Sequence, residues 1–296
     1  MLDVIVVGGS YAGISAALQL GRARRRILVL DAGTRRNRFA AHSHGFLGQD
    51  GRDPADIAAS ARAQVLAYPT VTWIDGAATD AEITADGFAV GVASGERHAA
   101  RRLVLASGVV DELPDIPGVA ERWGRSIFHC PYCHGYELDN GRIGVVATSP
   151  LSVHPTLLLP DWGPTTYFTQ HTFEPSVEEC MALERRGVTI EREPIVAVEG
   201  EPHEPSVRLA GGRVLAFAGL FVLPKTQVLS PLPVQLGCAF ESGPTGAYVQ
   251  TDAMKETTVP GVFACGDMAL PAGSVAFAVG DGARAGISAH QSLVFR

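Results

Sequence analysis

The first 31 residues contain a pattern that few folds can accommodate. The apolar run Leu2–Val7 is typical of a short strand buried on both faces, and the glycine-rich turn Gly8–Gly13 follows it directly. An Ala- and Leu-rich segment with helical spacing, residues 14–23, comes next, and a second apolar strand at 27–30 ends on Asp31. This order of strand, turn, helix, strand and acidic residue predicts a βαβ unit, and with it an α/β fold built on a parallel sheet.

The turn itself predicts a dinucleotide site. A tight glycine turn after a parallel strand lets backbone N–H groups and the positive end of the next helix meet a pyrophosphate. In the fingerprint G-x-G-x-x-G, Gly8 and Gly13 hold the first and third glycine positions, and Ser10 replaces the middle glycine with another small residue. Asp31, at the end of the second strand, is placed to accept the ribose hydroxyls of an adenosine.

Length and composition exclude several classes of protein. The chain has 296 residues, enough for one large or two ordinary domains, and its 46% of hydrophobic and 19% of charged residues exclude a disordered chain. A net charge of −7 argues against nucleic acid or an anionic membrane surface as a partner. No apolar run approaches the roughly 18–20 residues that span a bilayer, and the N-terminus lacks the features of a secretion signal. Five cysteines in a chain of this length do not suggest a disulfide framework. We therefore expect a soluble cytoplasmic enzyme.

The remaining pattern indicates one domain that is split in sequence by another. The Pro-containing stretch 111–118 has the composition of a linker, and Leu223–Lys225 marks the return to the first domain. We expect residues 1–112 and 223–296 to form the first domain and residues 113–222 to be inserted in it. Within the first domain, we expect a helix at 54–66 and separate strands at 71–74, 88–92, 97–103 and 104–108.

The most informative stretch is His129-Cys130-Pro131-Tyr132-Cys133-His134. Two cysteines separated by two residues can close a small disulfide ring. Thiol–disulfide exchange needs one sulfur that reacts with the substrate and a second that resolves the mixed disulfide. His134 follows the pair directly and can carry a proton between thiol and solvent near neutral pH. The stretch therefore predicts a redox-active cysteine pair.

Other interpretations of this stretch are open at this point. C-x-x-C-H is also the pattern of covalent haem attachment, which belongs to exported chains and is disfavoured without a signal segment. The pair could bind zinc together with His129 or His134, but a structural zinc site usually needs a second ligand pair, which the sequence does not show. Inert buried cysteines usually occur singly. We interpret three other cysteines in this way: Cys180, Cys238 and Cys265.

The C-terminal segment supplies a second nucleotide-site element. A strand at 261–265 is followed by Gly266-Asp267, and a helix rich in small residues runs from about Ser274 to Leu293. Taken alone, Asp267 could be an ordinary turn residue at the end of a strand. Together with the N-terminal fingerprint, the segment resembles the C-terminal flavin motif of the thioredoxin reductase family. The resemblance implies that Asp267 hydrogen-bonds the ribityl chain of FAD and that three residues lie close to the isoalloxazine: Ser274, Val275 and Ala276.

With both motifs in hand, the chain resembles the low-molecular-weight thioredoxin reductases over nearly its full length. The sequence Cys-Pro-Tyr-Cys-His and the His-rich loop 38–45 are similar to the branch that includes the dithiol oxidases of gliotoxin and holomycin biosynthesis. The resemblance implies two doubly wound Rossmann-like domains, a homodimer, and FAD in the domain formed by 1–112 and 223–296. The inserted domain, 113–222, would be the NADPH-like one that carries the cysteine pair. By position, Cys130 would exchange with substrate, Cys133 would be the flavin-proximal sulfur, and His134 would replace the usual acid/base aspartate.

One segment departs from the family pattern. Ordinary members carry a second glycine fingerprint for NADPH, whereas the aligned segment here, Ala147–Ser152, contains no glycine. Pro155 and Pro160 interrupt the helix that should follow, and the segment 170–174 offers no arginine to hold a 2′-phosphate. The sequence favours an enzyme that exchanges electrons with oxygen, ferredoxin or a small dithiol. A variant site that still binds NADPH loosely remains the alternative.

These observations predict a FAD-dependent dithiol–disulfide oxidoreductase without a bound metal. Its substrate would be a small dithiol or disulfide, or a thioredoxin-like protein, and loop 39–49 would line the substrate pocket. Two alternatives remain, an NADPH-dependent thioredoxin reductase and a flavin-binding redox sensor without turnover. The presence of both cysteines beside a histidine argues against the sensor.

Overall fold

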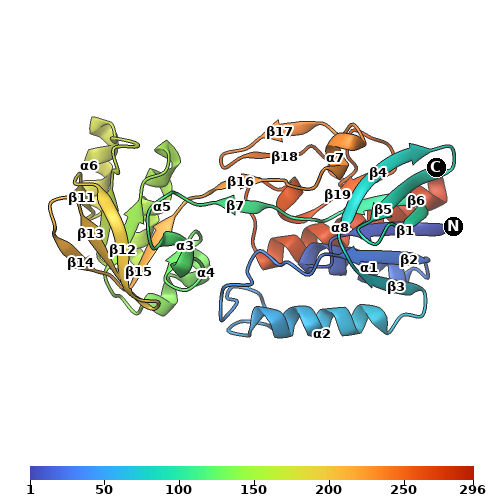
Figure 1. Cartoon of the computed structure of the whole chain (residues 1–296), viewed down its shortest axis with the longest axis horizontal. Helices are drawn as coiled ribbons and strands as arrows, with labels where there is room; N and C mark the ends of the chain where they lie inside the picture. The colour runs from blue at the N-terminus through green and yellow to red at the C-terminus, as the bar shows by residue number, and fades with distance from the viewer.

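Two sheets, each with parallel strands at its centre, form the framework of the molecule (Figure 1). The computed structural model describes residues 1–296. One sheet has seven strands in the order β3-β2-β1-β6-β5-β4, with β19 paired to β6, and the other has five in the order β11-β10-β9-β15-β8. In both sheets the chain extends to one side of an early strand and later returns to pair on its other side. Open parallel sheets bind ligands at the carboxyl ends of strands where the order reverses in this way.

The seven-stranded sheet is parallel through β3, β2, β1, β6 and β19 and antiparallel at β5 and β4. Its central strand β1 consists almost entirely of buried apolar residues because helices and loops cover both faces of the sheet. Its strands are β1 (Leu2–Val7), β2 (Ile27–Asp31), β3 (Val71–Asp75), β4 (Ala78–Thr84), β5 (Gly87–Val92), β6 (Arg97–Leu105) and β19 (Val262–Ala264).

Three longer helices pack with this sheet: α1 (Tyr11–Arg22), α2 (Pro54–Leu66) and α8 (Val275–Phe295). Helix α8 lies very close to α1, since a Cβ atom at Gly282 or Gly286 would overlap the backbone of Ala12 or Ala16. The two contacts advance together along both helices, so α1 and α8 run in the same direction. Their N-termini therefore lie at the same end of the sheet.

The five-stranded sheet is entirely parallel, and a three-stranded antiparallel sheet packs with it. The parallel strands are β8 (Ile127–Phe128), β9 (Ile143–Val146), β10 (Thr165–Phe168), β11 (Thr189–Glu191) and β15 (Gly219–Val222). The antiparallel strands are β12 (Ile195–Glu201), β13 (Glu204–Leu209) and β14 (Val214–Ala216). The helices here are short, namely α3 (Val119–Arg122), α4 (Pro131–His134), α5 (Val153–Leu158) and α6 (Val177–Arg185).

Two short strands connect the sheets. Strands β7 (Val110–Glu112) and β16 (Lys225–Gln227) pair antiparallel and run side by side between the two halves of the molecule (Figure 1). After β16 the chain forms α7 (Leu232–Gln235) and a hairpin of β17 (Phe240–Ser242) and β18 (Ala247–Val249). The division into 1–112 with 223–296 and 113–222 stays a prediction. None of the helices combines the length and apolar character that crossing a bilayer requires.

The structure differs from the sequence-based expectations at helix α1 and at two strands of the seven-stranded sheet, β6 and β4. Helix α1 begins at Tyr11 rather than at residue 14, because Ser10 ends the turn in an extended conformation. The segments 97–103 and 104–108, expected as two strands, form the single strand β6 and a following turn. Strand β4 was not predicted, because it lies at the sheet edge and most of its side chains are polar or exposed.

Candidate active site

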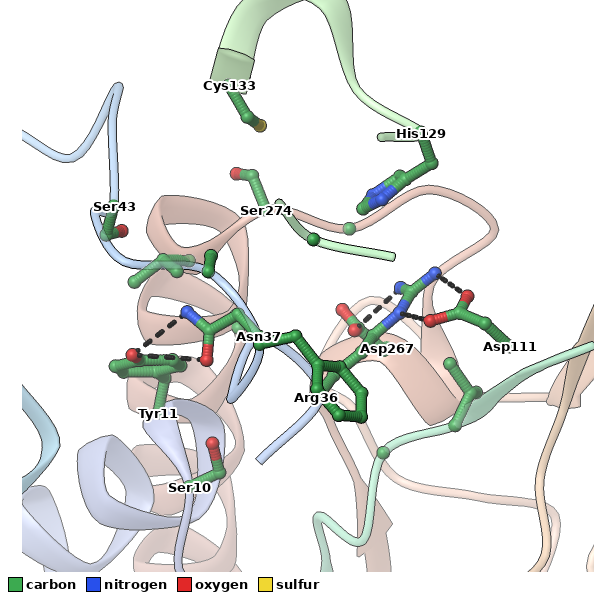
Figure 2. A pocket seen from close by; sticks show the side chains of 18 of the residues that line it. Ser10, Tyr11, Arg36, Asn37, Ser43, Asp111, His129, Cys133, Asp267 and Ser274 are labelled. Carbon is green, nitrogen blue, oxygen red and sulfur yellow. Dashed lines mark hydrogen bonds and ion pairs between the residues drawn. The ribbon is translucent and has the colours of Figure 1, made fainter. Parts of the chain in front are cut away.

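A cavity lies between the carboxyl end of the seven-stranded sheet and helix α4 (Figure 2). It has an open volume of about 1220 Å³ and is lined by residues that lie far apart in the sequence. The lining includes the N-terminus of α1, the loop after β2, the turn that follows β6, residues of the segment 123–134, and the start of α8. Six of the predicted site residues line it: Ser10, Cys133, His134, Asp267, Ser274 and Val275.

The turn between β1 and α1 can form only with glycine at two positions. Gly8 has a φ of +106°, and a Cβ atom there would overlap the carbonyl oxygen of Ala106. A Cβ atom at Gly13 would overlap the carbonyl oxygen of Gly8. The N-terminus of α1 has no side-chain cap at Ser10 and no acidic residue in its first turn. Its first N–H groups are therefore available to an anionic ligand, as a dinucleotide site requires.

Asp31 closes the same turn from the neighbouring strand. Its Oδ1 accepts hydrogen bonds from the backbone N–H groups of Gly9 and Gly33, both at 3.1 Å. Its Oδ2 has no hydrogen bond from the protein, so one carboxylate oxygen can still accept hydroxyl groups. Asp31 lies outside the cavity lining.

An arginine that the sequence analysis missed occupies the centre of the site. Arg36 donates to both oxygens of Asp111, at 2.9 and 2.5 Å, and to Asp267 Oδ2 at 2.9 Å (Figure 2). Burial disfavours the guanidinium charge, but hydrogen bonds and charges of the two carboxylates raise the pKa of Arg36 above its ordinary value. No local signal distinguishes Arg36 from its neighbours Arg35 and Arg38, because its partners lie in β7 and after β19.

The cysteine pair sits on helix α4 above the cavity. Cys130 and Cys133 form a disulfide with their Cα atoms 5.3 Å apart. Cys130 is the N-cap of α4, and Pro131 occupies the first helical position, where the missing N–H costs nothing. Cys133 lines the cavity and Cys130 does not, and the Cys133 sulfur points toward Ser274 (Figure 2). The disulfide favours the redox interpretation of the pair over zinc binding, which needs free thiolates.

Two partly buried histidines, His129 and His134, flank the disulfide. His134 stacks on Phe128, with ring centroids 4.2 Å apart and planes at 13°, and its buried Nδ1 has no hydrogen-bond partner. Burial, reinforced by the charges of His129 and His44, lowers the pKa of His134 to about 4. Burial and the charge of Arg36 lower the pKa of His129 to about 4 as well. Both imidazoles are therefore neutral near pH 7, a state in which His134 can accept a proton.

The loop after β2 closes one side of the cavity. Only part of the predicted substrate loop 39–49 lines it: Phe39, Ala40, His42, Ser43 and His44. The Nδ1 atom of His44 lies 3.4 Å from Glu137 and 3.7 Å from Asp50, so His44 links this loop to the segment that follows α4. On α8, Ser274, Val275 and Ala278 line the cavity while Ala276 does not. Helical periodicity turns Ala276 away from the face that carries residues 275 and 278.

The turn after β9 differs from the turn after β1. The N–H groups of Thr148 and Ser149 donate to the Oγ atom of Ser152, at 3.1 and 3.4 Å. The next residue, Pro150, has no N–H, and helix α5 has only six residues. Nearby, both polar atoms of the Gln170 side chain bond the backbone of Ile195. At this turn the N–H groups of Thr148 and Ser149 are thus already paired, and Pro150 has none to offer a pyrophosphate.

Comparison with known proteins places this geometry in a family. Residues 2–288 match the model of the pyridine nucleotide-disulphide oxidoreductases. The chain belongs to this family. Thioredoxin reductase tcpT of Claviceps purpurea is 31% identical over 99% of this chain and 95% of the relative. An oxidoreductase structure from Agrobacterium tumefaciens is 56% identical, with a TM-score of 0.96 and 99% of each chain covered. The structure of HlmI is 37% identical, with a TM-score of 0.92 over 99% of this chain and 92% of HlmI.

These likenesses confirm the expected family and branch, and the fold class of two Rossmann-like domains. They also confirm a flavoprotein disulfide oxidoreductase of thioredoxin reductase type. FAD is implied by the family, and the glycine turn with the uncapped N-terminus of α1 fits it. The roles of individual residues in this oxidoreductase remain predictions.

Proposed function

We propose that this oxidoreductase exchanges electrons between a dithiol substrate and FAD through the Cys130–Cys133 disulfide, and that NADPH is not its electron partner. One observation carries the proposal. The Cys133 sulfur lines the same cavity as the N-terminus of α1 and as Asp267. Cys130 lies outside this lining, so in our proposal Cys130 would meet the substrate and Cys133 would face the flavin.

Residues of four segments would hold FAD. The Gly8–Gly13 turn and the α1 N-terminus would bind the pyrophosphate, and the free Oδ2 of Asp31 would accept the adenosine ribose hydroxyls. Asp267 would hydrogen-bond the ribityl chain, and Ser274 and Val275 would lie near the isoalloxazine. When bound, FAD supplies an acceptor for the two electrons that a dithiol releases on oxidation.

The substrate exchange can be written with balanced atoms and electrons. A substrate thiolate attacks the Cys130 sulfur, the Cys130–Cys133 bond breaks, and Cys133 leaves as a thiolate. The second substrate thiolate attacks the substrate sulfur bound to Cys130, the mixed disulfide breaks, Cys130 leaves as a thiolate, and the substrate is released as a disulfide. Two electrons have then passed from the substrate to the cysteine pair, and Cys133 faces the cavity.

His134 is placed to move the protons of this exchange. Oxidation of a dithiol releases two protons, and a neutral imidazole beside the pair can accept one at a time. Burial keeps His134 neutral near pH 7, and stacking on Phe128 fixes the ring. This supports a base of low pKa rather than a histidine that titrates near neutral pH.

The turn after β9 supports the exclusion of NADPH. Ser152 accepts the two N–H groups that a glycine turn would present to a pyrophosphate, and Pro150 offers none. The second cavity at this end of β9 is lined by Glu112 and Asp115 as well as Lys225, a poor setting for a 2′-phosphate. The electron acceptor would then be oxygen, ferredoxin or a small disulfide.

Anaerobic reduction of the purified holoprotein tests the proposal. Under argon, dithiothreitol should bleach the flavin absorbance of the wild type, whereas micromolar NADPH should leave it unchanged. Cys133→Ser should retain FAD and lose turnover, and Cys180→Ser serves as the matched control with wild-type turnover. Unchanged turnover in Cys133→Ser would refute the mechanism. Rapid bleaching by NADPH would instead establish the alternative, an NADPH-dependent thioredoxin reductase.

The biological setting follows from the family and stays a prediction. We expect a homodimer in the cytoplasm and a small dithiol or a thioredoxin-like protein as the substrate. Screening both substrate kinds for turnover in air distinguishes an oxidase from a flavin-binding sensor, because the sensor would turn over neither.

A further inference from the structure

The short 3-10 helix η4 (Gly266–Ala269) carries Asp267 into the cavity, yet it has no cap of its own. Its first N–H, that of Gly266, donates to Oδ2 of Asp281 at 2.9 Å. Its last carbonyl, that of Ala269, accepts from Nζ of Lys255 at 3.4 Å. Both ends of the helix that presents Asp267 are thus held by side chains from elsewhere in the chain.

The two side chains that hold η4 are also paired with each other. Lys255 Nζ lies 3.2 Å from Asp281 Oδ1, and the exposed fractions of the two side chains are only 8% and 11%. A buried ion pair seldom adds net stability over apolar side chains of similar size, since both charges lose their hydration. The pair therefore calls for an explanation other than stability.

The backbone of Lys255 is held in a conformation that few lysines adopt. Its φ is +66°, in the left-handed region, where residues other than glycine are strained. Its carbonyl accepts the N–H of Ala264 at 3.0 Å, which ties it to β19 immediately before η4. Lys255 is thus fixed to the strand that enters η4, and Asp281 is fixed to the helix, α8, that lines the cavity.

We propose that Asp281 and Lys255 are positioning residues that set the orientation of the Asp267 carboxylate toward the flavin. This rests on the proposed function, in which Asp267 binds the ribityl chain. Asp281 binds the N–H of Gly266 and does not line the cavity, so its effect on the cofactor must pass through the backbone of Gly266 and Asp267.

Titration of the FAD-free full-length chain with FAD tests this, with flavin fluorescence as the readout and thermal unfolding of the FAD-free protein beside it. Asp281→Ala should weaken FAD binding roughly tenfold, the effect expected for removing one member of a coupled pair. Because this variant leaves Lys255 buried without a partner, it should also unfold at a lower temperature. Arg284→Ala, on the exposed side of the same helix, is the control and should match the wild type in both measurements.

Two further variants separate positioning from stability. Lys255→Met combined with Asp281→Ala removes the unpaired charge, so it should regain thermal stability while FAD binding stays weak. In an Asp267→Ala background, Asp281→Ala should have no further effect on FAD affinity. Recovery of wild-type affinity in the Lys255–Asp281 double variant, or independent effects of Asp267→Ala and Asp281→Ala, would overturn the inference. A wild-type chain that fails to take up FAD would instead refute the proposed function, and the inference with it.

Discussion

Acidification should destabilise this protein through the partly buried histidines His129 and His134, and His134 offers the clearest test. In the folded protein the pKa of His134 is about 4, against an ordinary value of 6.5. Between these values the unfolded chain binds a proton that the folded protein does not. The contribution of the neutral His134 to the free energy of unfolding is therefore fully present above pH 6.5 and is lost as the pH falls toward 4.

The size of the effect follows from the pKa difference. Each pH unit in this window costs about 1.4 kcal/mol for one proton, so His134 accounts for about 2 kcal/mol between pH 6.5 and 5. The loss of unfolding free energy due to His134 reaches about 3 kcal/mol at pH 4. His129 has its pKa lowered in the same direction, so the wild type should lose stability about twice as steeply as one histidine alone requires.

Replacement of His134 by phenylalanine isolates its share. His134→Phe keeps an aromatic ring against Phe128 but binds no proton. We would measure the free energy of unfolding in urea by tryptophan fluorescence at pH 7, 6 and 5. It should fall less steeply with decreasing pH for this variant than for the wild type. Trp123 and Trp162 lie in the same half of the molecule as His134, so the signal reports on the relevant region.

A control and a direct measurement complete the test. His203→Asn, in the exposed turn between β12 and β13, should follow the wild-type pH dependence. The carboxylates contribute equally to the pH dependence of unfolding in all three proteins, so their contribution cancels in the comparison. Equal slopes for His134→Phe and wild type, or a His134 ring that titrates near pH 6.5 in an NMR experiment, would refute the reasoning.

Three further predictions concern the glycine turn, the arginine and the second turn. A Cβ atom at position 13 would overlap the carbonyl of Gly8, so Gly13→Ala should weaken FAD binding by more than about 2 kcal/mol in a FAD titration. Gly280→Ala is the control and should bind FAD like the wild type, because the space around position 280 is open. Arg36→Met leaves Asp111 and Asp267 without their cation, so it should lower the free energy of unfolding in urea by about 3 kcal/mol. Arg38→Met, at an exposed position, should change the free energy of unfolding little. Ser152→Ala should lower the free energy of unfolding by about 1 kcal/mol. It should not enable NADPH to reduce the flavin, because Pro150 remains. Reduction of the flavin by NADPH in this variant would contradict our account of the turn.

Elements whose determinants are local could be predicted from the sequence. The helix at 54–66 has the bounds that apolar spacing and flanking residues predict. The turn from Gly8 to Gly13 could be predicted for the same reason, since the glycines, the strand and the helix follow one another directly. The cysteine pair needs only two residues between its members to form a disulfide.

The contacts at the centre of the cavity could not be predicted in this way. Arg36 is 75 residues from Asp111 and 231 from Asp267, and three segments must fold before the guanidinium meets both carboxylates. The same holds for Lys255 and Asp281, which meet only where η4 packs against α8. Charged residues are usually solvated, so nothing in the sequence distinguishes Arg36, Lys255 or Asp281 from an ordinary surface residue.

The two turns that follow β1 and β9 show how one fold can retain its topology and lose a ligand site. Both turns follow a parallel strand with a paired strand on either side, and both lead into a helix. After β1, glycines leave the backbone bare and the helix N-terminus uncapped. After β9, one hydroxyl, that of Ser152, takes up the donors of Thr148 and Ser149, which satisfies the backbone without any ligand. A turn that is already satisfied gains little from a pyrophosphate, since binding would first have to break these hydrogen bonds. This contrast is the physical reason why we expect dithiols, rather than NADPH, to deliver electrons to the flavin.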